Sequence, residues 1–206
     1  MHNAPAEHKP TAERIGLVAC GALAREVLAV IDANHFSHIE TRFLPAGLHN
    51  TPGEIPGAVD AALAELGTTC DRLLVGYGDC GTAGRLDKVL ARHHAERISG
   101  AHCYAFYAGL GKFDTLQNAE PGTFYLTDYL ARQFETLVWK PLGLDRHPEL
   151  REDYFGNYSR LIYLSQSADE KLEARARDAA DRLGLRFERI DTGFGGIETF
   201  IGEHAA

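Results

Sequence analysis

The feature that most constrains the fold is a repeated junction between a short apolar run and a glycine-containing turn. It occurs at residues 17–21, 75–81 and 99–103, and each junction carries one cysteine: Cys20, Cys80 and Cys103. A short apolar run bounded by turn residues is typical of a buried strand. If these runs are parallel strands, all three thiols emerge at the carboxyl edge of a sheet, where open α/β proteins bind their ligands. The pattern therefore predicts a shared thiol or metal site.

Strand-like and helix-like segments alternate along the rest of the chain. We predict strands at 15–19, 39–44, 72–75, 161–164 and 187–190, a weak strand centred on Ile98, and helices at 23–31, 58–66, 85–93 and 170–183. Such alternation favours an α/β fold with a mostly parallel sheet flanked by helices, which is a Rossmann-like arrangement. We expect a single domain over residues 14–206, which could consist of two packed halves, and a flexible tail over residues 1–13. Between His102 and Phe134 the aromatic spacing does not identify any element.

Composition narrows the class of protein. The 206 residues are 45% hydrophobic and 24% charged, enough to bury a full core, and the net charge is -8. An acidic chain without a Lys/Arg cluster is a poor ligand for phosphate backbones, so we expect no nucleic-acid partner. No segment approaches the ~20 apolar residues of a membrane span, so we expect no membrane partner and a cytoplasmic protein. In a reducing compartment, the four cysteines are better candidates for ligands, nucleophiles or core residues than for disulfides.

The predicted elements separate the cysteines into two groups. Cys20 and Cys80 are expected directly before helices, whose N-terminal amides and dipole favour a thiolate over a thiol. Cys70 precedes the strand at 72–75 whereas Cys80 follows it, which places them roughly 20 Å apart at ~3.3 Å per residue. We therefore exclude Cys70 from the site and interpret it as a small buried apolar residue.

Two histidines can complete a metal site. His49 follows the strand at 39–44 on the same predicted edge, and His102 is adjacent to Cys103. Three sulfurs with one imidazole form a tetrahedral zinc set, and three sulfurs with an open corner suit an iron–sulfur cluster. The alternative for each cysteine is simple packing, because cysteine is among the most buried residue types.

The turn after the third predicted strand also matches a dinucleotide fingerprint, with Gly76, Gly78 and Gly81 as its glycines. That fold needs an acidic residue after the next strand, but Ile98 is followed by Ser99 and Gly100, so we do not predict nicotinamide or flavin binding. We expect the three glycines instead to let the backbone approach a metal or an anionic ligand.

Two carboxylates near the cysteines are candidates for proton transfer. Asp79 is adjacent to Cys80, and Glu26 lies in the first predicted helix. The alternatives are that Asp79 caps a helix and that Glu26 is solvated.

The same segments carry a family resemblance. Residues 18–26, 44–50, 75–81, 102–104 and 144–150 resemble the signature blocks of domain-of-unknown-function family 1638, over a span of 15–193. The resemblance implies a common fold and a site that includes Cys20, Glu26, His49, Cys80, His102 and Cys103. It also implies an association with corrinoid-dependent methyl transfer.

These observations predict a metal-binding α/β protein that holds zinc or an iron–sulfur cluster. The predicted ligands are Cys20, Cys80 and Cys103 with His49 or His102. As an enzyme, it would act on a small molecule in one-carbon transfer or lyase chemistry, with Asp79 or Glu26 moving the proton. One alternative is an accessory protein that binds a metal, a cluster or a corrinoid-type cofactor for a methyltransferase system. The other is a metal-free thiol sensor that uses Cys20 and Cys80.

Overall fold

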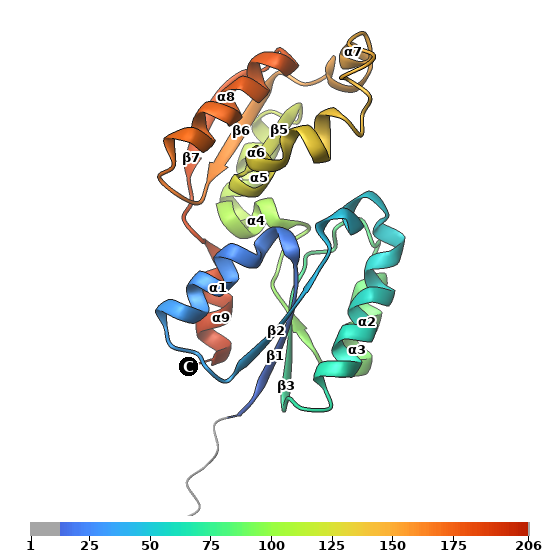
Figure 1. The fold of residues 1–206 in the computed structure, drawn as a ribbon, viewed down its shortest axis with the longest axis vertical. Coiled ribbons are helices and arrows are strands. Elements are labelled where there is room, and N and C mark those ends of the chain that lie inside the picture. Colours follow the sequence, from blue (N-terminus) through green and yellow to red (C-terminus); the bar gives the residue numbers. More distant parts are fainter. Residues whose placement is uncertain (1–12, 206) are drawn as a thin grey trace, which may run out of the picture.

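The computed structural model describes residues 13–205, which form two parallel sheets flanked by helices (Figure 1). The first sheet has the strand order β2-β1-β3-β4 and the second has the order β5-β6-β7. Every strand pair is parallel, which confirms the predicted α/β class. Apart from Glu13, the predicted tail lies outside the described residues.

The strands are short and follow the buried apolar runs. The first sheet consists of β1 Ile15–Cys20, β2 Ile39–Leu44, β3 Arg72–Gly76 and β4 Glu96–Arg97. The second consists of β5 Thr123–Thr127, β6 Arg160–Ser165 and β7 Arg186–Asp191.

Helices connect the strands. They are α1 Ala24–Ala33, α2 Ile55–Leu66, α3 Arg85–His93, α4 Cys103–Ala108, α5 Leu110–Ala119, α6 Asp128–Phe134, α7 Leu150–Phe155, α8 Glu170–Leu183 and α9 Gly196–Ala205. Three 3-10 turns, η1 Gly21–Leu23, η2 Ala46–Asn50 and η3 Pro52–Glu54, and the π-helical turn η4 Glu135–Trp139 complete the elements. Across residues 13–205, no helix combines the length and the apolarity that a membrane crossing requires.

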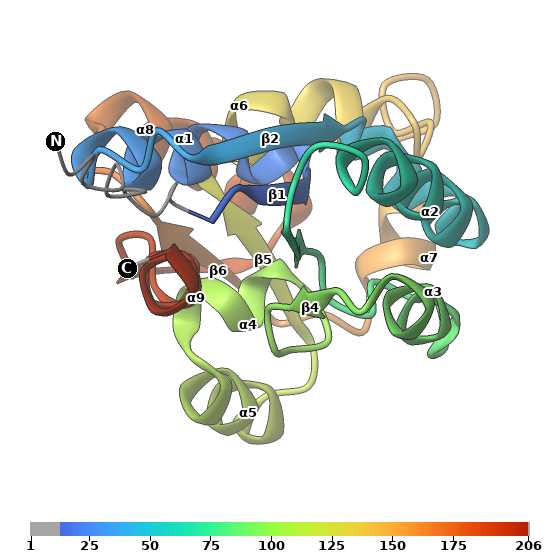
Figure 2. The same cartoon turned by 90° about the horizontal axis from the view of Figure 1, so that it is seen from below.

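Each sheet is covered on both faces. In the first lobe, built on the first sheet, α1 and α9 lie on one face and α2 and α3 on the other (Figures 1 and 2). In the second lobe, Leu161 and Tyr163 face the core shared with α6 and α8. Ile162 and Leu164 point to the opposite face and join α4 and the first lobe in a continuous core. This alternation along β6 is the period of a strand that is buried on both sides.

The chain passes between the lobes twice. It leaves the first sheet through residues 98–103 and returns from β7 through residues 191–196 into α9, which packs against α1 and α4. The C-terminal helix therefore belongs to the first lobe, although the segment before it belongs to the second.

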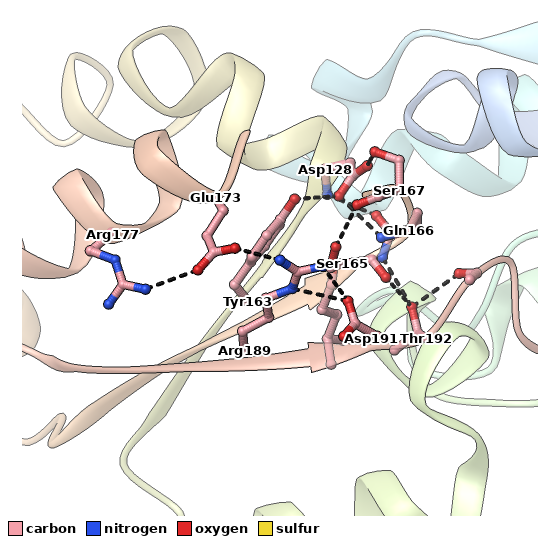
Figure 3. Close-up of polar contacts among 12 residues, drawn as sticks. Asp128, Tyr163, Ser165, Gln166, Ser167, Glu173, Arg177, Arg189, Asp191 and Thr192 are labelled. Atoms are coloured by element: carbon pink, nitrogen blue, oxygen red, sulfur yellow. Dashed lines mark hydrogen bonds and ion pairs between the residues drawn. The ribbon is translucent and has the colours of Figure 1, made fainter. Parts of the chain in front are cut away.

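A polar network ties the strand ends of the second sheet together (Figure 3). The buried Asp128 carboxylate accepts hydrogen bonds from the Tyr163 hydroxyl at 2.6 Å, from the Gln166 amide at 3.1 Å and from the Ser167 hydroxyl. The Asp128 amide donates to Gln166 Oε1 at 2.7 Å, and Gln166 Nε2 donates to the Leu164 carbonyl at 2.6 Å. These bonds link the end of β5 to the end of β6.

Some predicted elements match the structure and others need correction. β2, α3 and α8 have the predicted bounds. The weak strand centred on Ile98 was placed too late, because β4 consists of Glu96–Arg97 and ends before Ile98. Helix α2 begins at Ile55, earlier than predicted, because Pro56 is tolerated in the first turn, where its missing N–H leaves no hydrogen bond unmade.

Candidate functional site

A cavity of about 140 Å³ lies between the carboxyl ends of the two sheets. The first lobe contributes Cys20, His49, Cys80 and Cys103 to its wall, and the second lobe contributes Thr127, Tyr129, Leu130 and Leu137. The structure thus brings all three predicted thiols and one predicted histidine to a single cavity.

Cys20 ends β1 and starts the next turn. Its register partner at the end of β2 is Leu44, and a Cβ on Gly21 would lie 2.9 Å from the Leu44 carbonyl oxygen, so the two strand ends need glycine here to lie this close. Cys20 Sγ accepts a hydrogen bond from the Ala22 amide at 3.4 Å and lies 3.9 Å from Nδ1 of His49. The Cys20 thiol therefore caps the N-terminus of η1 and also lies beside the His49 imidazole.

Cys80 lies in the turn after β3 and has a left-handed φ of 48°. Helix α3 begins only at Arg85, so the prediction that Cys80 directly precedes a helix is wrong. The Asp79 carboxylate shapes this turn by accepting from the Thr82 hydroxyl at 2.9 Å and from the Gly84 amide at 2.8 Å. These hydrogen bonds lower the pKa of Asp79, and the one from the Gly84 amide has the largest effect.

Cys103 is the first residue of α4, and a close backbone contact brings it to the cavity. The Cys80 amide donates to the Ala101 carbonyl at 2.8 Å, and a Cβ on Gly78 would lie 2.7 Å from the Ala101 carbonyl carbon. Glycine at 78 thus allows the segment before Cys103 to lie on the turn that carries Cys80. Gly76 and Gly78 line the cavity, whereas Gly81, with φ of 82°, serves the turn beside it.

Burial dominates the electrostatics of the thiols. It raises the pKa of Cys20, raises the pKa of Cys80 to about 11, and raises the pKa of Cys103 further, where the neighbouring Cys20 and Cys80 add to the effect. The Ala22 amide lowers the pKa of Cys20 by less than burial raises it. The predicted preference for thiolates is therefore wrong for the metal-free protein, whose thiols are protonated at neutral pH.

The two candidate histidines lie in different surroundings. His49 lies at the rim of the cavity and is partly open to solvent. Its ring is stacked on Tyr77 with the ring centroids 6.2 Å apart, and the desolvation of the ring lowers the pKa of His49. His102 is the N-cap residue of α4 but does not line the cavity; its ring packs edge-on against Tyr104 and Phe113. His102 Nδ1 is buried and has no hydrogen-bond partner among residues 13–205. His49 is thus the histidine that lies beside a thiol.

Glu26 and Cys70 lie away from the cavity wall. Glu26 is 4% exposed, so its interpretation as a solvated residue is wrong; burial raises its pKa, and its Oε2 has no partner in the described part of the chain. Its role in proton transfer, like that of Asp79, stays a prediction. Cys70 precedes β3 at the far end of the sheet, but it is half-buried rather than buried, with Sγ 3.9 Å from Glu40 Oε2.

Several wall residues carried no prediction. The aromatic residues Tyr77, Tyr104, Phe106 and Tyr129 make up much of the lining. Tyr77 could have been found, because it lies within the 76–81 turn that the sequence singles out. Tyr129 follows β5, a strand that the sequence does not reveal, so no local signal identified it.

The described residues 13–205 contain no group of three or more His, Cys, Asp or Glu side chains already arranged to hold a metal ion. The chemistry of the donors nevertheless fits a soft metal, since thiolate and imidazole are the ligands that zinc prefers. Binding through three sulfurs requires side-chain movement and the loss of their protons.

The sequence matches a known protein family. The sequence model of a family described as "Protein of unknown function (DUF1638)" matches residues 43–201. The matched part includes His49, Cys80 and Cys103 and begins after the segment with Cys20. No curated protein matches the chain.

Proposed function

We propose that this chain, which belongs to the DUF1638 family of proteins of unknown function, holds a metal–thiolate centre in the cavity between its two lobes. In this proposal Cys20, Cys80 and Cys103 bind a zinc ion, and His49 supplies the nitrogen ligand. One observation carries the proposal: four donors from segments far apart in the sequence line the same small cavity.

The state of the thiols favours a metal centre over a thiol sensor. Redox-sensing cysteines react as thiolates and therefore have low pKa values and accessible sulfurs. Here burial raises the pKa of all three thiols. A bound cation is the partner that would deprotonate them, because metal coordination stabilises the thiolate directly.

His49 is the preferred fourth ligand. Its Nδ1 already lies 3.9 Å from Cys20 Sγ, and its lowered pKa keeps the ring neutral near pH 7, which is the form that binds metal. Because His49 lies at the rim, it is also the ligand that a substrate could replace most easily. An iron–sulfur cluster on the three sulfurs is the variant, in which His49 leaves the fourth corner free.

The cavity gives the centre room for a small molecule, which supports an enzyme. A zinc ion supplies Lewis-acid chemistry and can activate a thiol or a water, as one-carbon transfer or lyase reactions require. The protein's own residues would hold the substrate between the two lobes and shield it from water. A corrinoid methyltransferase system is the partner that we propose for such an activity.

The size of the cavity argues against the alternative of an accessory protein that encloses a corrinoid-type cofactor. Drug-sized ligands occupy pockets of roughly 300–1,000 Å³, and a corrinoid is larger than such ligands. At about 140 Å³, the cavity suits a small substrate better than an enclosed tetrapyrrole.

Metal analysis of anaerobically purified protein tests the proposal. We expect equimolar zinc and a colourless protein. Iron together with broad visible absorption would show that the protein holds an iron–sulfur cluster instead of zinc. The absence of bound metal, together with no uptake of added zinc or iron, would refute the metal centre.

Single substitutions test the ligand set. Cys20→Ser, Cys80→Ser and Cys103→Ser should each weaken zinc binding by more than about 100-fold, since even residues that only support metal ligands change affinity by about 10- to 100-fold. Cys70→Ser is the matched control and should keep its metal. His49→Gln should weaken zinc binding and His102→Gln should not. The reverse result would show that His102, and not His49, is the fourth ligand.

A further inference from the structure

A groove of about 290 Å³ lies between α6 and α8, which pack against each other in the second lobe (Figures 1 and 2). Three arginines line this groove, Arg132 from α6 and Arg175 and Arg182 from α8, together with Ala131, Phe134, Glu135 and Asp178. None of these residues lines the cavity that holds the thiols. The groove is therefore distinct from the proposed metal centre.

Arg182 is held by its own neighbours. The carbon at the centre of its guanidinium lies 4.0 Å from the centroid of the Trp139 ring, and the guanidinium forms ion pairs with Glu135 and, at 3.6 Å, with Asp178. Both acidic side chains of the groove therefore have Arg182 as their partner.

The other two arginines of the groove have no such partner. Within residues 13–205, neither Arg132 nor Arg175 forms an ion pair or a side-chain hydrogen bond, whereas Arg177 and Arg182 of α8 do. Arg132 is half-buried and Arg175 is exposed, so both guanidinium groups can be reached from solvent.

The groove therefore carries an excess of positive charge. Three arginines face two carboxylates on its wall, in a chain whose net charge is -8. Because arginine stays protonated in proteins, this charge does not depend on pH in the physiological range. The sequence does not reveal this excess, because Arg132 and Arg175 are far apart along the chain and come together only when α6 packs on α8.

The chemistry of the two unpaired groups selects the ligand. A guanidinium presents a planar fork of N–H donors, which binds two oxygens of a carboxylate or a phosphate at once. A carboxylate has two oxygens and satisfies one fork, whereas a phosphate has enough oxygens to bridge two. A cavity of about 150 Å³ already holds a benzene molecule, so the groove also has room for a small molecule that carries the phosphate.

We infer that the groove between α6 and α8 binds a phosphate group, free or carried by a small molecule, between the guanidinium groups of Arg132 and Arg175. The site uses no residue of the metal centre. It borders the same helix, however, because the first turn of α6 contributes Tyr129 and Leu130 to the thiol cavity.

Three ligands test the charge and the shape of the bound group. Inorganic phosphate, glycerol 3-phosphate and acetate would each be titrated into the full chain at pH 8 and followed by amide chemical shifts in NMR. The ionic strength is kept constant, because salt screens exposed charges. We expect both phosphates to bind at least about 10-fold more tightly than acetate, with shifts in α6 and α8. No saturable binding of either phosphate, or equally tight binding of acetate, would overturn the inference.

The two phosphates also distinguish the source of the bound group. Tighter binding of glycerol 3-phosphate would support a phosphorylated small molecule, and tighter binding of inorganic phosphate would support the free ion. The titrations are made with metal-free and with zinc-loaded protein, and we expect the same affinity in both. Phosphate binding that requires zinc would place the anion on the metal and would overturn the inference.

Arginine variants locate the site. Arg132→Gln and Arg175→Gln should each weaken phosphate binding at least about 10-fold, the loss expected for a hydrogen bond to a charged group. Arg151→Gln is the matched control, because Arg151 is exposed and has no ion pair among the described residues, but does not line the groove. An equal loss in Arg151→Gln would show that phosphate responds only to overall charge, which would refute the site. If Arg132→Gln does not fold, Arg175→Gln and the three ligands decide the question.

Discussion

The carboxyl ends of the two sheets face the same cavity, but their buried polar groups are in opposite states. In the second lobe, Asp128 and Gln166 are hydrogen-bonded to neighbours at the ends of β5 and β6 (Figure 3). The hydroxyl of Tyr125 has no partner among the described residues, but Tyr125 lies in the middle of β5 and not at its end. In the first lobe, Glu26, Tyr77 and His102 each leave a buried polar atom without a partner among the described residues.

The contrast separates scaffold from site. A buried polar group that is fully hydrogen-bonded stabilises one arrangement of the chain, whereas an unpaired one costs free energy until something binds it. The saturated strand ends of the second lobe therefore form a rigid wall. The unsaturated ends of the first lobe, which also carry the thiols, are the side on which we expect chemistry.

The largest expected effect is the pH dependence of zinc binding, which depends only on first-lobe residues. Burial raises the thiol pKa values, so each thiol is protonated at pH 6–8 and must lose a proton to bind metal. His49, with its lowered pKa, is neutral over most of this range. Zinc affinity should therefore fall by ~1,000-fold for each unit of decrease in pH, one factor of ten per thiol. Competition with a chelator between pH 6 and 8 measures the slope, and a flat profile would show that the thiols are not the ligands.

The next effect breaks the second-lobe network. Asp128→Ala removes the acceptor of three hydrogen bonds and should lower the free energy of unfolding by about 3 kcal/mol, because the Tyr163 hydroxyl and the Gln166 amide remain buried and unpaired. Tyr77→Phe removes a buried hydroxyl that has no partner among the described residues, so it should not lower the free energy of unfolding and should raise it by up to about 1–3 kcal/mol. Urea denaturation of both variants checks the difference. Equal losses of stability in the two variants would contradict the distinction between the carboxyl ends of the two sheets.

A smaller effect tests how the first-lobe edge is assembled. Gly78→Ala forces a Cβ to within 2.7 Å of Ala101 and should cost about 1–3 kcal/mol, with Cys103 displaced from the cavity and zinc binding weakened. Gly57→Ala is the control, since its Cβ would meet nothing in the exposed face of α2 and should stabilise the protein by about 0.5–1 kcal/mol. Thermal denaturation and zinc titration of the pair provide the measurement, and unaltered zinc binding in Gly78→Ala would contradict this account.

The smallest effect concerns the buried carboxyl of the first lobe. Because burial raises the pKa of Glu26, the folded protein holds this proton more tightly than the unfolded chain does, so stability falls as pH rises from the unfolded pKa through the folded one. Glu26→Gln removes this loss and should be more stable than the wild type at pH 8, with the two proteins converging near pH 4. Denaturation at both pH values tests it, and a variant that is less stable at pH 8 would indicate that the charged form is needed.

The sequence predicted the elements whose signals are local. Residues 39–44, 85–93 and 170–183 have clear periodicity, and the predicted bounds match β2, α3 and α8. β5 was missed because Thr123–Thr127 lies in an aromatic-rich stretch where helical and extended spacings overlap. Its identity as a strand depends on pairing with β6, which is a long-range contact.

The candidate site likewise has parts that the sequence predicted and parts that it could not predict. The prediction brought Cys20, Cys80 and Cys103 to one sheet edge from strand direction alone, and the structure places all three on one cavity. The pKa values of the thiols could not be predicted, because burial depends on how the second lobe packs over them. The choice of His49 over His102 as the neighbour of a thiol likewise depends on the path of α4 after the first crossing.

The double passage of the chain between the lobes has a mechanical consequence. With one link at residues 98–103 and another at 191–196, cutting a single peptide bond cannot set either lobe free, and rotation of one lobe against the other is confined to an axis through both links. Cys103 lies at the end of the first link. An ion that joined its sulfur to those of Cys20 and Cys80 would therefore hold this end of the first link against the first sheet, so the occupancy of the centre would be coupled to the direction in which the chain enters the second lobe.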